Sequence, residues 1–318
     1  MEEYPRNLAE LEAMFGTEAA CREYLQKLRF PQGFCCLRCQ GRIAWTTRRN
    51  LLVCAACQYQ LSLTAGTIFQ DTRKPLTMWF RAIWWVTAQK NGASALGLQQ
   101  VLGLGSYATA WTWLHKLRRA MVRPNREQLQ GRVEVDETYI GGVEEGARGR
   151  KTATKALVVI ACEEDQRGIG RIRLRQIANP SMGTLRRFVV ETIARGSVVH
   201  TDAWDGYKGL EDCGYEHVVT VIKGSRHTGS ELLPRVHIVA SLLKRWLLGT
   251  HQGAVSPKHL DYYLDEFAFR FNRRKSASRG KLFYRLLQQA VAIGPAPYAV
   301  VVAAEKPKPQ PVVLTGVN

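Results

Sequence analysis

Residues 132–142 read RVEVDETYIGG, and this stretch decides the fold of the central part of the chain. Its β-branched and aromatic residues favour an extended strand, and the paired glycines end that strand. Alternation places Glu134 and Asp136 on one face and the two valines on the other. A carboxylate is costly to bury unless it is paired, so Asp136 lies either at a solvated edge or beside a positive charge.

Further strand and helix patterns follow this stretch. Residues 155–162 are apolar on both faces, which predicts a central strand, and residues 171–177 alternate cleanly. A helix is expected at 181–194, and strands are expected at 197–200 and 216–222. This order of strands and helices predicts an α/β layer fold with a mixed sheet.

Asp136 and Asp202 are the acidic residues that such a sheet could bring together. Asp202 follows the strand at 197–200, and the two aspartates meet at one edge if the first and fourth strands are neighbours. Adjacent carboxylates repel each other unless a hard cation lies between them, and Mg²⁺ binds few protein carboxylates while keeping sites for water and phosphate. The alternative is that Asp202 only caps the turn after it.

A helix expected from Pro234 adds a histidine and a lysine to these aspartates. His237 and Lys244 are two turns apart and share one face of the helix. A neutral imidazole can join two carboxylates on a divalent metal, and the lysine would then face a phosphate. A histidine on a helix is more often a packed or exposed side chain, so the pattern alone leaves both interpretations open.

The composition indicates a folded protein with an anionic partner. The chain has 318 residues, 46% hydrophobic and 23% charged, which argues against a natively disordered chain. Its net charge of +18 indicates nucleic acid as the partner ahead of an anionic membrane. There is no apolar run of about 18 residues, and the N-terminus is acidic and polar, so we expect no membrane span and no signal peptide. The expected location is cytoplasmic and nucleoid-associated.

Eight cysteines in a reducing compartment need a role other than disulfides. Cys36 and Cys39 form one CxxC pair, Cys54 and Cys57 form another, and a strand-turn-strand pattern joins them. Two such pairs brought together complete an all-sulfur tetrahedral site that suits structural Zn²⁺. The alternatives are four reduced structural cysteines, or Cys35 as a competing ligand.

Residues 94–121 have the pattern of a helix-turn-helix, with Ser94 as the first cap and a basic end on the second helix. In such units the second helix enters the major groove of DNA, although any helical hairpin gives the same pattern. Six basic residues at two helix ends are expected to contact phosphates: Lys116, Arg118, Arg119, Arg270, Arg273 and Arg274. The last three also suit the helix dipole without DNA.

The order of these motifs resembles bacterial insertion-sequence transposases of the zinc-ribbon group. The CxxC pairs and the helix-turn-helix are followed by VEVDETYIGG, HTDAWDGY, HxxxSLLKR and SPKHLDYYLDEFAFRFNRR, and the last string is the most specific part. The similarity spans roughly residues 20–290. It implies a ribonuclease-H-like catalytic domain with a DD(E/N/H)K active site.

The resemblance also implies roles for four residues. Asp136 and Asp202 match the catalytic aspartates, and His237 falls where many relatives carry Glu or Asn. Lys244 matches the lysine of the family. We interpret His237 as the histidine variant, which would hold Mg²⁺ or Mn²⁺ with the two aspartates. Two other acids are fallback third ligands: Glu231 and Glu266.

The predicted function is a DNA transposase that binds the terminal inverted repeats of an insertion sequence and catalyses metal-dependent strand cleavage and transfer. Because two ends must be joined, we expect a homodimer or larger assembly on double-stranded DNA. The expected domains are a helical lead-in (1–29), a zinc ribbon (30–65), a helical DNA-binding region (66–126), the catalytic domain (130–292) and a flexible tail (293–318). The alternatives are a nuclease or resolvase of the same fold, a catalytically dead DNA-binding regulator, and a zinc-ribbon RNA-binding protein.

Overall fold

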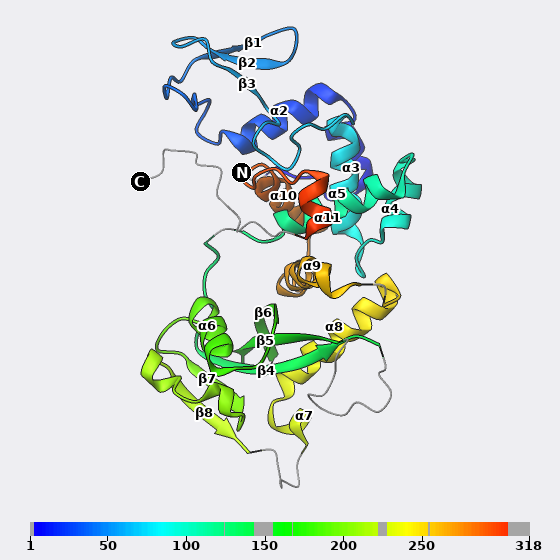
Figure 1. Cartoon of the computed structure of the whole chain (residues 1–318). Helices are drawn as coiled ribbons and strands as arrows, with labels where there is room; N and C mark the ends of the chain where they lie inside the picture. The colour runs from blue at the N-terminus through cyan, green and yellow to red at the C-terminus, as the bar shows by residue number, and fades with distance from the viewer. Residues whose placement is uncertain are drawn as a thin grey trace. The chain divides into compact units, whose positions relative to one another are not determined.

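The computed structural model describes residues 3–123, 125–142, 155–166, 168–221, 228–253 and 255–304. The chain divides into two compact units (Figure 1). We call Met1–Asn125 with Ser276–Asn318 the N-terminal unit, and Arg126–Lys275 the central unit. Every helix among the described residues is too short or too polar to cross a membrane.

The central unit contains a five-stranded sheet. Its strands are β4 (Arg132–Ile140), β5 (Ala156–Asp165), β6 (Gly168–Ile177), β7 (Val198–Asp202) and β8 (Glu216–Thr220). They lie in the order β6-β5-β4-β7-β8, with β5 antiparallel to both neighbours and β4, β7 and β8 parallel. The predicted ribonuclease-H-like mixed sheet is confirmed, and its first and fourth strands, β4 and β7, are neighbours, which is the condition under which the two aspartates could meet.

Two of these strands extend beyond their predicted ends. β5 and β6 continue past the apolar stretches into a hairpin in which Asp165 pairs with Gly168. The backbone groups at the polar ends of the two strands form hydrogen bonds with each other. The hydrophobic pattern of the sequence alone does not reveal this pairing. The strand expected at 216–222 ends at Thr220 in the structure, and its last expected residue lies outside the described residues.

Helices cover both faces of the sheet (Figure 1). They are α6 (Met182–Thr192), α7 (Gly229–Leu232), α8 (Pro234–His251) and α9 (Leu260–Asn272), with short 3₁₀ helices η1 (Asp205–Tyr207), η2 (Glu211–Cys213) and η3 (Pro257–His259). Val133 and Val135 of β4 are buried in the core beneath α6. Glu134 and Asp136 therefore face the opposite side, where α8 and α9 pack.

The N-terminal unit combines a small sheet with helices. Its elements are α1 (Leu8–Phe15), α2 (Glu18–Arg29), β1 (Ala44–Thr46), β2 (Leu51–Cys54), β3 (Gln60–Ser62), α3 (Leu76–Ala88), α4 (Ala95–Leu102), α5 (Tyr107–Ala120), α10 (Arg279–Ala290) and α11 (Tyr298–Ala303). Antiparallel β1, β2 and β3 form the ribbon. The predicted α4-turn-α5 unit is present, with Ser94 Oγ accepting a hydrogen bond from the Gly97 amide at 3.0 Å.

Aromatic side chains form the core of the N-terminal unit. Trp79 and Phe80 of α3 are 0% and 1% exposed, and Trp79 stacks on Trp113 of α5 with ring centroids 3.7 Å apart. Phe283 of α10 lies 5.8 Å from the ring of Phe80. Such large buried areas dominate packing energetics. The aromatic side of α3 is therefore structural and is not a surface for stacking bases.

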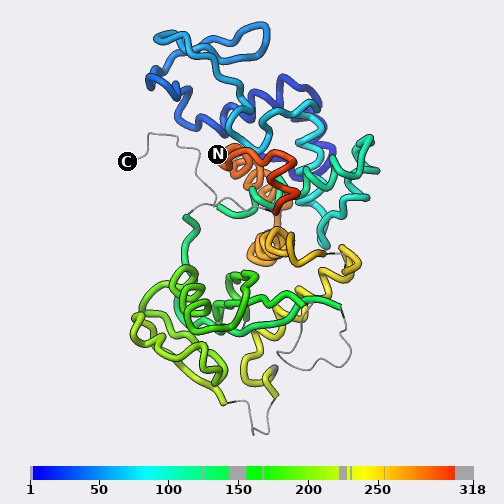
Figure 2. Tube along the Cα trace, viewed as in Figure 1, coloured from blue at the N-terminus to red at the C-terminus, as the bar shows by residue number. Residues whose placement is uncertain are grey.

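The structure divides the C-terminal part of the chain differently from the predicted domains. Helix α10, expected at the end of the catalytic domain, packs on α3 and α5 in the N-terminal unit, where Leu282, Phe283 and Leu286 are buried. Figure 2 traces this return of the chain in orange and red. Part of the expected tail is also helical. It forms α11, in which Val301 is fully buried. Residues 305–318 lie outside the described residues.

Candidate active site

Strands β4 and β7 carry the two aspartates to the same level of the sheet. Their parallel pairing ends with Glu134 opposite His200. Asp136 and Asp202 each lie two residues further along, and therefore on the same face as that pair. The two aspartates therefore lie just beyond the end of the shared ladder, on one face of the sheet.

Helix α8 brings His237 to Asp136. Nε2 of His237 lies 3.7 Å from Oδ2 of Asp136, which is too far for a hydrogen bond. The same nitrogen is buried and has no hydrogen-bond partner among the described residues. Since ligand bonds from nitrogen and oxygen to a small divalent cation are about 2.1 Å, the separation fits two ligands of one ion.

The surroundings of His237 favour its neutral form. Burial lowers the pKa of this histidine below its ordinary 6.5, the charge of Lys244 lowers it further, and the charge of Glu134 partly opposes both. A neutral imidazole has the free lone pair that a metal needs. His237 is therefore held in the state that can act as a ligand at neutral pH.

Asp202 makes a turn-capping hydrogen bond, and it lies near the buried Tyr207, as Asp136 does. Its Oδ1 accepts a hydrogen bond from the Trp204 amide at 3.0 Å, so the capping role considered from the sequence is present. Tyr207 is buried nearby, and its pKa is raised well above the ordinary value by burial first and then by Glu137, Asp136 and Asp202. The capping bond engages one oxygen of Asp202, and the second has no hydrogen bond to the described part of the chain.

Lys244 lies on the exposed side of α8. Its side chain makes no hydrogen bond or ion pair with the part of the chain that the structure describes. Desolvation lowers its pKa, and the charge of Lys155 lowers it further. Two lysines close together raise the local positive potential and favour an anionic ligand such as phosphate.

Neither fallback acid is available as a third ligand. Glu231 closes a capping box with Thr228 at the start of α7. Glu266 is 1% exposed, and its Oε1 accepts hydrogen bonds from Nε and Nη2 of Arg270 at 2.8 and 2.7 Å. These contacts engage both acids within the protein. They also hold Arg270, so its phosphate contact stays a prediction.

The basic end of α5 is engaged within the N-terminal unit. Arg118 is 1% exposed, with one guanidinium nitrogen 3.4 Å from Nε2 of His115, and this burial argues against its predicted phosphate contact. Arg119 donates to the Pro295 carbonyl at 3.2 Å, and desolvation lowers the pKa of Lys116. The helical pattern did not show that α10 and α11 would cover this end of α5.

The arginines after α9 are also engaged within their own unit. Arg273 stacks over the ring of Phe269 and Arg274 over the ring of Phe271, each at 4.0 Å. Arg274 also donates to the carbonyl groups of Gly170 and Ile169. Cation–π stacking leaves part of a guanidinium exposed. Phosphate contacts from these two residues therefore stay a prediction.

The four predicted cysteines form a metal-ligand cluster. Their sulfurs lie within 4.8 Å of one another, with Cys36 and Cys57 at 3.6 Å and Cys39 and Cys54 at 3.5 Å. Sulfurs on a tetrahedral zinc are about 3.8 Å apart, from a Zn–S bond of about 2.3 Å. Burial opposes ionisation of Cys36, yet nearby amides and thiols lower its pKa to about 7. The donor set fits Zn²⁺, and Cys35 is outside it.

The sequence-based list of candidates missed four arginines in the ribbon. Arg38, Arg42, Arg48 and Arg49 are all exposed, and the chain from residue 24 to 70 contains no acidic residue. Exposed apolar side chains lie between them, notably Trp45 at 46%. The long stretch without acids was a signal that could have identified this surface.

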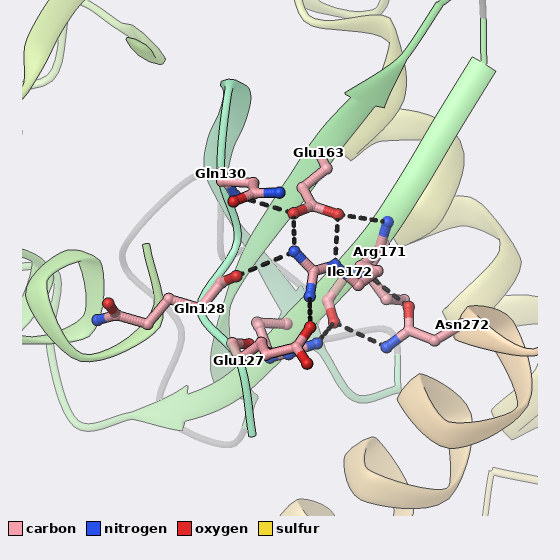
Figure 3. Close-up of polar contacts among 8 residues, drawn as sticks. Glu127, Gln128, Gln130, Glu163, Arg171, Ile172 and Asn272 are labelled. Atoms are coloured by element: carbon pink, nitrogen blue, oxygen red, sulfur yellow. Dashed lines mark hydrogen bonds and ion pairs between the residues drawn. The ribbon is translucent and has the colours of Figure 1, made fainter. Parts of the chain in front are cut away.

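A second charged cluster lies nearer the N-terminal end of β4. Glu163 of β5, beside Val133 in the ladder, accepts hydrogen bonds from Arg171 side-chain nitrogens at 2.6 and 2.8 Å. The backbone amides of Gln130 and Arg171 donate to the same carboxylate at 2.8 and 3.0 Å (Figure 3). Arg171 also donates to the Gln128 carbonyl at 3.0 Å. Both oxygens of Glu163 are thus fully engaged by protein.

Comparison with known proteins identifies two matching families. Residues 128–272 match the ISXO2-like transposase domain, and residues 16–60 match the transposase zinc-ribbon domain. A protein of transposable element ISH50 from Halobacterium salinarum, described as uncharacterized, is 25% identical over 275 residues, which cover 80% of this chain and 91% of that protein. The chain thus combines a transposase zinc-ribbon domain with an ISXO2-like transposase domain.

Two solved structures of Mos1 complexes also align with this chain. The Mos1 strand transfer complex and the pre-cleavage Mos1 transpososome each align with 14% identity and a TM-score of 0.28. Each alignment covers 70% of this chain and 78% of the matched chain.

Proposed function

We propose that this transposase cuts and joins DNA strands at a divalent-metal site formed by Asp136, Asp202 and His237. The observation that carries the proposal is the position of His237 Nε2, buried without a hydrogen-bond partner among the described residues and 3.7 Å from Asp136 Oδ2. A buried polar atom without a partner costs about 1–3 kcal/mol. A cation shared with Asp136 would remove that cost.

The proposed reaction is an in-line displacement at phosphorus. A new P–O bond forms to water during cleavage, or to a 3′-hydroxyl during joining, while the opposite P–O bond breaks. The attacking oxygen loses its proton and the leaving oxygen gains one, so there is no net redox change. When bound, Mg²⁺ or Mn²⁺ supplies activation of the attacking oxygen and stabilisation of the leaving oxygen.

The residues of the chain provide orientation and charge in this proposal. Asp136 and Asp202 contribute carboxylate oxygens, and His237 contributes a ring nitrogen, because its lowered pKa favours the neutral imidazole, which has one nitrogen lone pair free to bind a cation. Lys244 holds the scissile or neighbouring phosphate as a point charge. Because the backbone of β4, β7 and α8 is fixed by the sheet and its cores, these groups are preorganised.

The ribbon supplies a surface for docking double-stranded DNA in this proposal. Its four exposed arginines carry positive charge without any acid nearby in sequence, which favours phosphate contacts. Trp45 adds an exposed ring between them that can pack on sugars or bases. Joining two ends requires at least two copies of the chain on DNA.

A cleavage and joining assay tests the catalytic proposal. We expect Asp136→Asn to abolish Mn²⁺-dependent cleavage of a duplex that carries the element's end, and joining of a pre-cut end, without loss of folding. Glu191→Gln is the matched control, since Glu191 is an exposed carboxylate of the same unit that pairs with Arg175. Wild-type activity in Asp136→Asn would contradict the proposal, and cleavage without joining in the wild type would favour a nuclease.

A salt titration tests the docking surface. The double substitution Arg48→Ala and Arg49→Ala should weaken duplex binding and reduce the slope of log K against log salt by about 1.8 if both contact phosphates. Arg81→Ala is the control, because Arg81 is an exposed arginine of the same unit that pairs with Glu12 at 2.8 Å. An unchanged slope, or stronger binding of RNA than of DNA, would contradict this assignment.

A further inference from the structure

Helix α8 begins without a capping side chain of its own. Its N-cap residue is Leu233, which has no side-chain hydrogen-bond acceptor, and Pro234 follows at the first helical position. The first-turn amides of Arg235 and Val236 instead donate to Oε2 of Glu134 at 2.7 and 3.0 Å. A carboxylate from strand β4 thus performs the capping role that a local Ser, Thr, Asp or Asn usually has.

We propose that Glu134 is the positioning residue that sets His237 against Asp136. Glu134 precedes Asp136 by two positions on the same face of β4, and the amide that it holds at Val236 precedes His237 by one. One buried carboxylate therefore links the backbone beside each of the two proposed ligands. This inference rests on the proposed function of Asp136 and His237.

The carboxylate of Glu134 is held from a second direction. Oε1 accepts a hydrogen bond from Nη1 of Arg235 at 2.8 Å, and the Glu134 side chain is 1% exposed. The same Arg235 nitrogen lies 3.1 Å from Oε1 of Glu164 on β5. Because both oxygens have partners in fixed directions, the side chain has one well-defined position rather than several rotamers.

The network continues to the strand that carries the second aspartate. Glu164 Oε1 accepts from Nε of Arg132 at 3.0 Å, and Nη2 of Arg132 lies 3.3 Å from Nδ1 of His200. His200 faces Glu134 across the β4–β7 ladder and precedes Asp202 by two positions. The polar layer of Glu134, Arg235, Glu164, Arg132 and His200 therefore connects all three elements that carry the proposed metal ligands.

Stability alone does not explain a buried polar layer of this kind. Burying paired charges is often no more stabilising than well-packed hydrophobic residues of the same volume. It does fix distances, and a displacement of about 1 Å at a catalytic group can cost about 100-fold in rate. The position of the layer, directly beside both aspartates and the start of α8, matches a positioning role.

Three substitutions of Glu134 separate positioning from stability. Gln keeps the side-chain length, and its one carbonyl oxygen can accept both α8 amides as Oε2 does. Its amide nitrogen cannot accept from Arg235, which keeps its contact with Glu164. Asp keeps the charge but is shorter by one methylene, about 1.5 Å. Ala removes the cap. Glu163→Gln is the matched control, because Glu163 is a buried carboxylate on the neighbouring strand that bonds Arg171 and not α8.

Two measurements on the full chain test the positioning role of Glu134. We expect Mn²⁺ affinity, measured by titration with electron paramagnetic resonance, to fall about 10- to 100-fold in Glu134→Asp and Glu134→Ala. Glu134→Gln should stay within about threefold of wild type, as should Glu163→Gln even where its melting temperature falls. Hydrogen exchange at the amides of residues 235 and 236 should accelerate in the Asp and Ala variants only.

Wild-type Mn²⁺ affinity in a folded Glu134→Asp would overturn the proposal, as would a loss in Glu134→Gln equal to that in Glu134→Ala. If Glu134→Ala does not fold, the Asp and Gln variants still make the comparison. Failure of the proposed function has a different signature: Mn²⁺ would bind Asp136→Asn as tightly as wild type, while the exchange of the α8 amides would still respond to Glu134.

Discussion

Glu163 and Asp136 are carboxylates on neighbouring strands of one sheet, but their surroundings differ. Glu163 receives four hydrogen bonds, two from the Arg171 side chain and two from backbone amides. Asp136 faces His237, whose Nε2 is buried without a hydrogen-bond partner among the described residues. One cluster is complete as folded, and the other contains a polar atom that the described protein does not satisfy.

Under the proposed function, this difference separates charged groups that stabilise the fold from charged groups that bind a ligand. A fully bonded buried ion pair has no vacant lone pair to offer, so its removal should affect folding and leave chemistry intact. A buried nitrogen with a free lone pair lowers stability, and this cost is typical of functional sites. The comparison therefore predicts opposite responses to substitution at the two clusters.

His237→Ala should give the largest separation of activity from stability. We expect the cleavage rate to fall about 100-fold or more, equivalent to about 3 kcal/mol of lost transition-state stabilisation. The free energy of unfolding should stay within about 1 kcal/mol of wild type, because the substitution also removes an unsatisfied buried nitrogen. Single-turnover cleavage and denaturant unfolding measure the two quantities.

His259→Ala is the control for that substitution. His259 is a half-buried histidine of the same unit, with Nδ1 3.1 Å from Oγ of Ser256. Its replacement should leave the cleavage rate within about twofold of wild type. Equal losses of activity in both histidine variants would remove the distinction between the two clusters.

Glu163→Gln should show the reverse pattern. Breaking this buried pair should lower the free energy of unfolding by about 3 kcal/mol, near the low end for such pairs because Arg171 keeps its contacts with Glu127 and Gln128. The cleavage rate of the folded variant at low temperature should match wild type. A large loss of activity with unchanged unfolding would show that the cluster takes part in catalysis.

The stability difference between wild type and Glu163→Gln should depend on pH. Burial opposes ionisation of Glu163, but its hydrogen bonds to Arg171 and to backbone amides lower its pKa below the ordinary 4.5. The unfolded state then binds more protons than the folded state at acidic pH. The stabilisation by ionised Glu163 is therefore complete above pH 4.5 and is lost as the pH falls through the lowered pKa of the folded state. Denaturant unfolding of both proteins between neutral and acidic pH measures this change, and a constant difference would contradict it.

Lys244→Gln should give a smaller effect than the substitutions of His237 and Glu163. Lys244 makes no ion pair among the described residues, whereas Lys275 pairs with Asp165 at 2.6 Å. Losing one phosphate contact should weaken DNA binding a few-fold and reduce the salt slope by about 0.9. Lys275→Gln should leave both unchanged, and filter binding across a salt series compares them. Identical slopes for the two variants would contradict the assigned role of Lys244.

The pattern of the sequence was sufficient for much of this molecule. Strand alternation predicted the faces of β4, the spacing of two CxxC pairs predicted the cysteine cluster, and the motif order predicted the transposase family. These features are local or depend on short repeats, and local geometry constrains them strongly. The helix boundaries of α4 and α5 followed from the same kind of signal.

Contacts between distant segments decided the remaining features. Arg118 looked like a DNA contact because helical periodicity cannot show that the end of α5 is buried. Glu266 looked like a possible ligand until its pairing with Arg270 was visible. The sequence by itself predicted which residues carry the chemistry. Only the tertiary structure decided that Glu134 caps α8 and that His237 faces Asp136, because hydrogen bonds and burial depend on which segments meet in space.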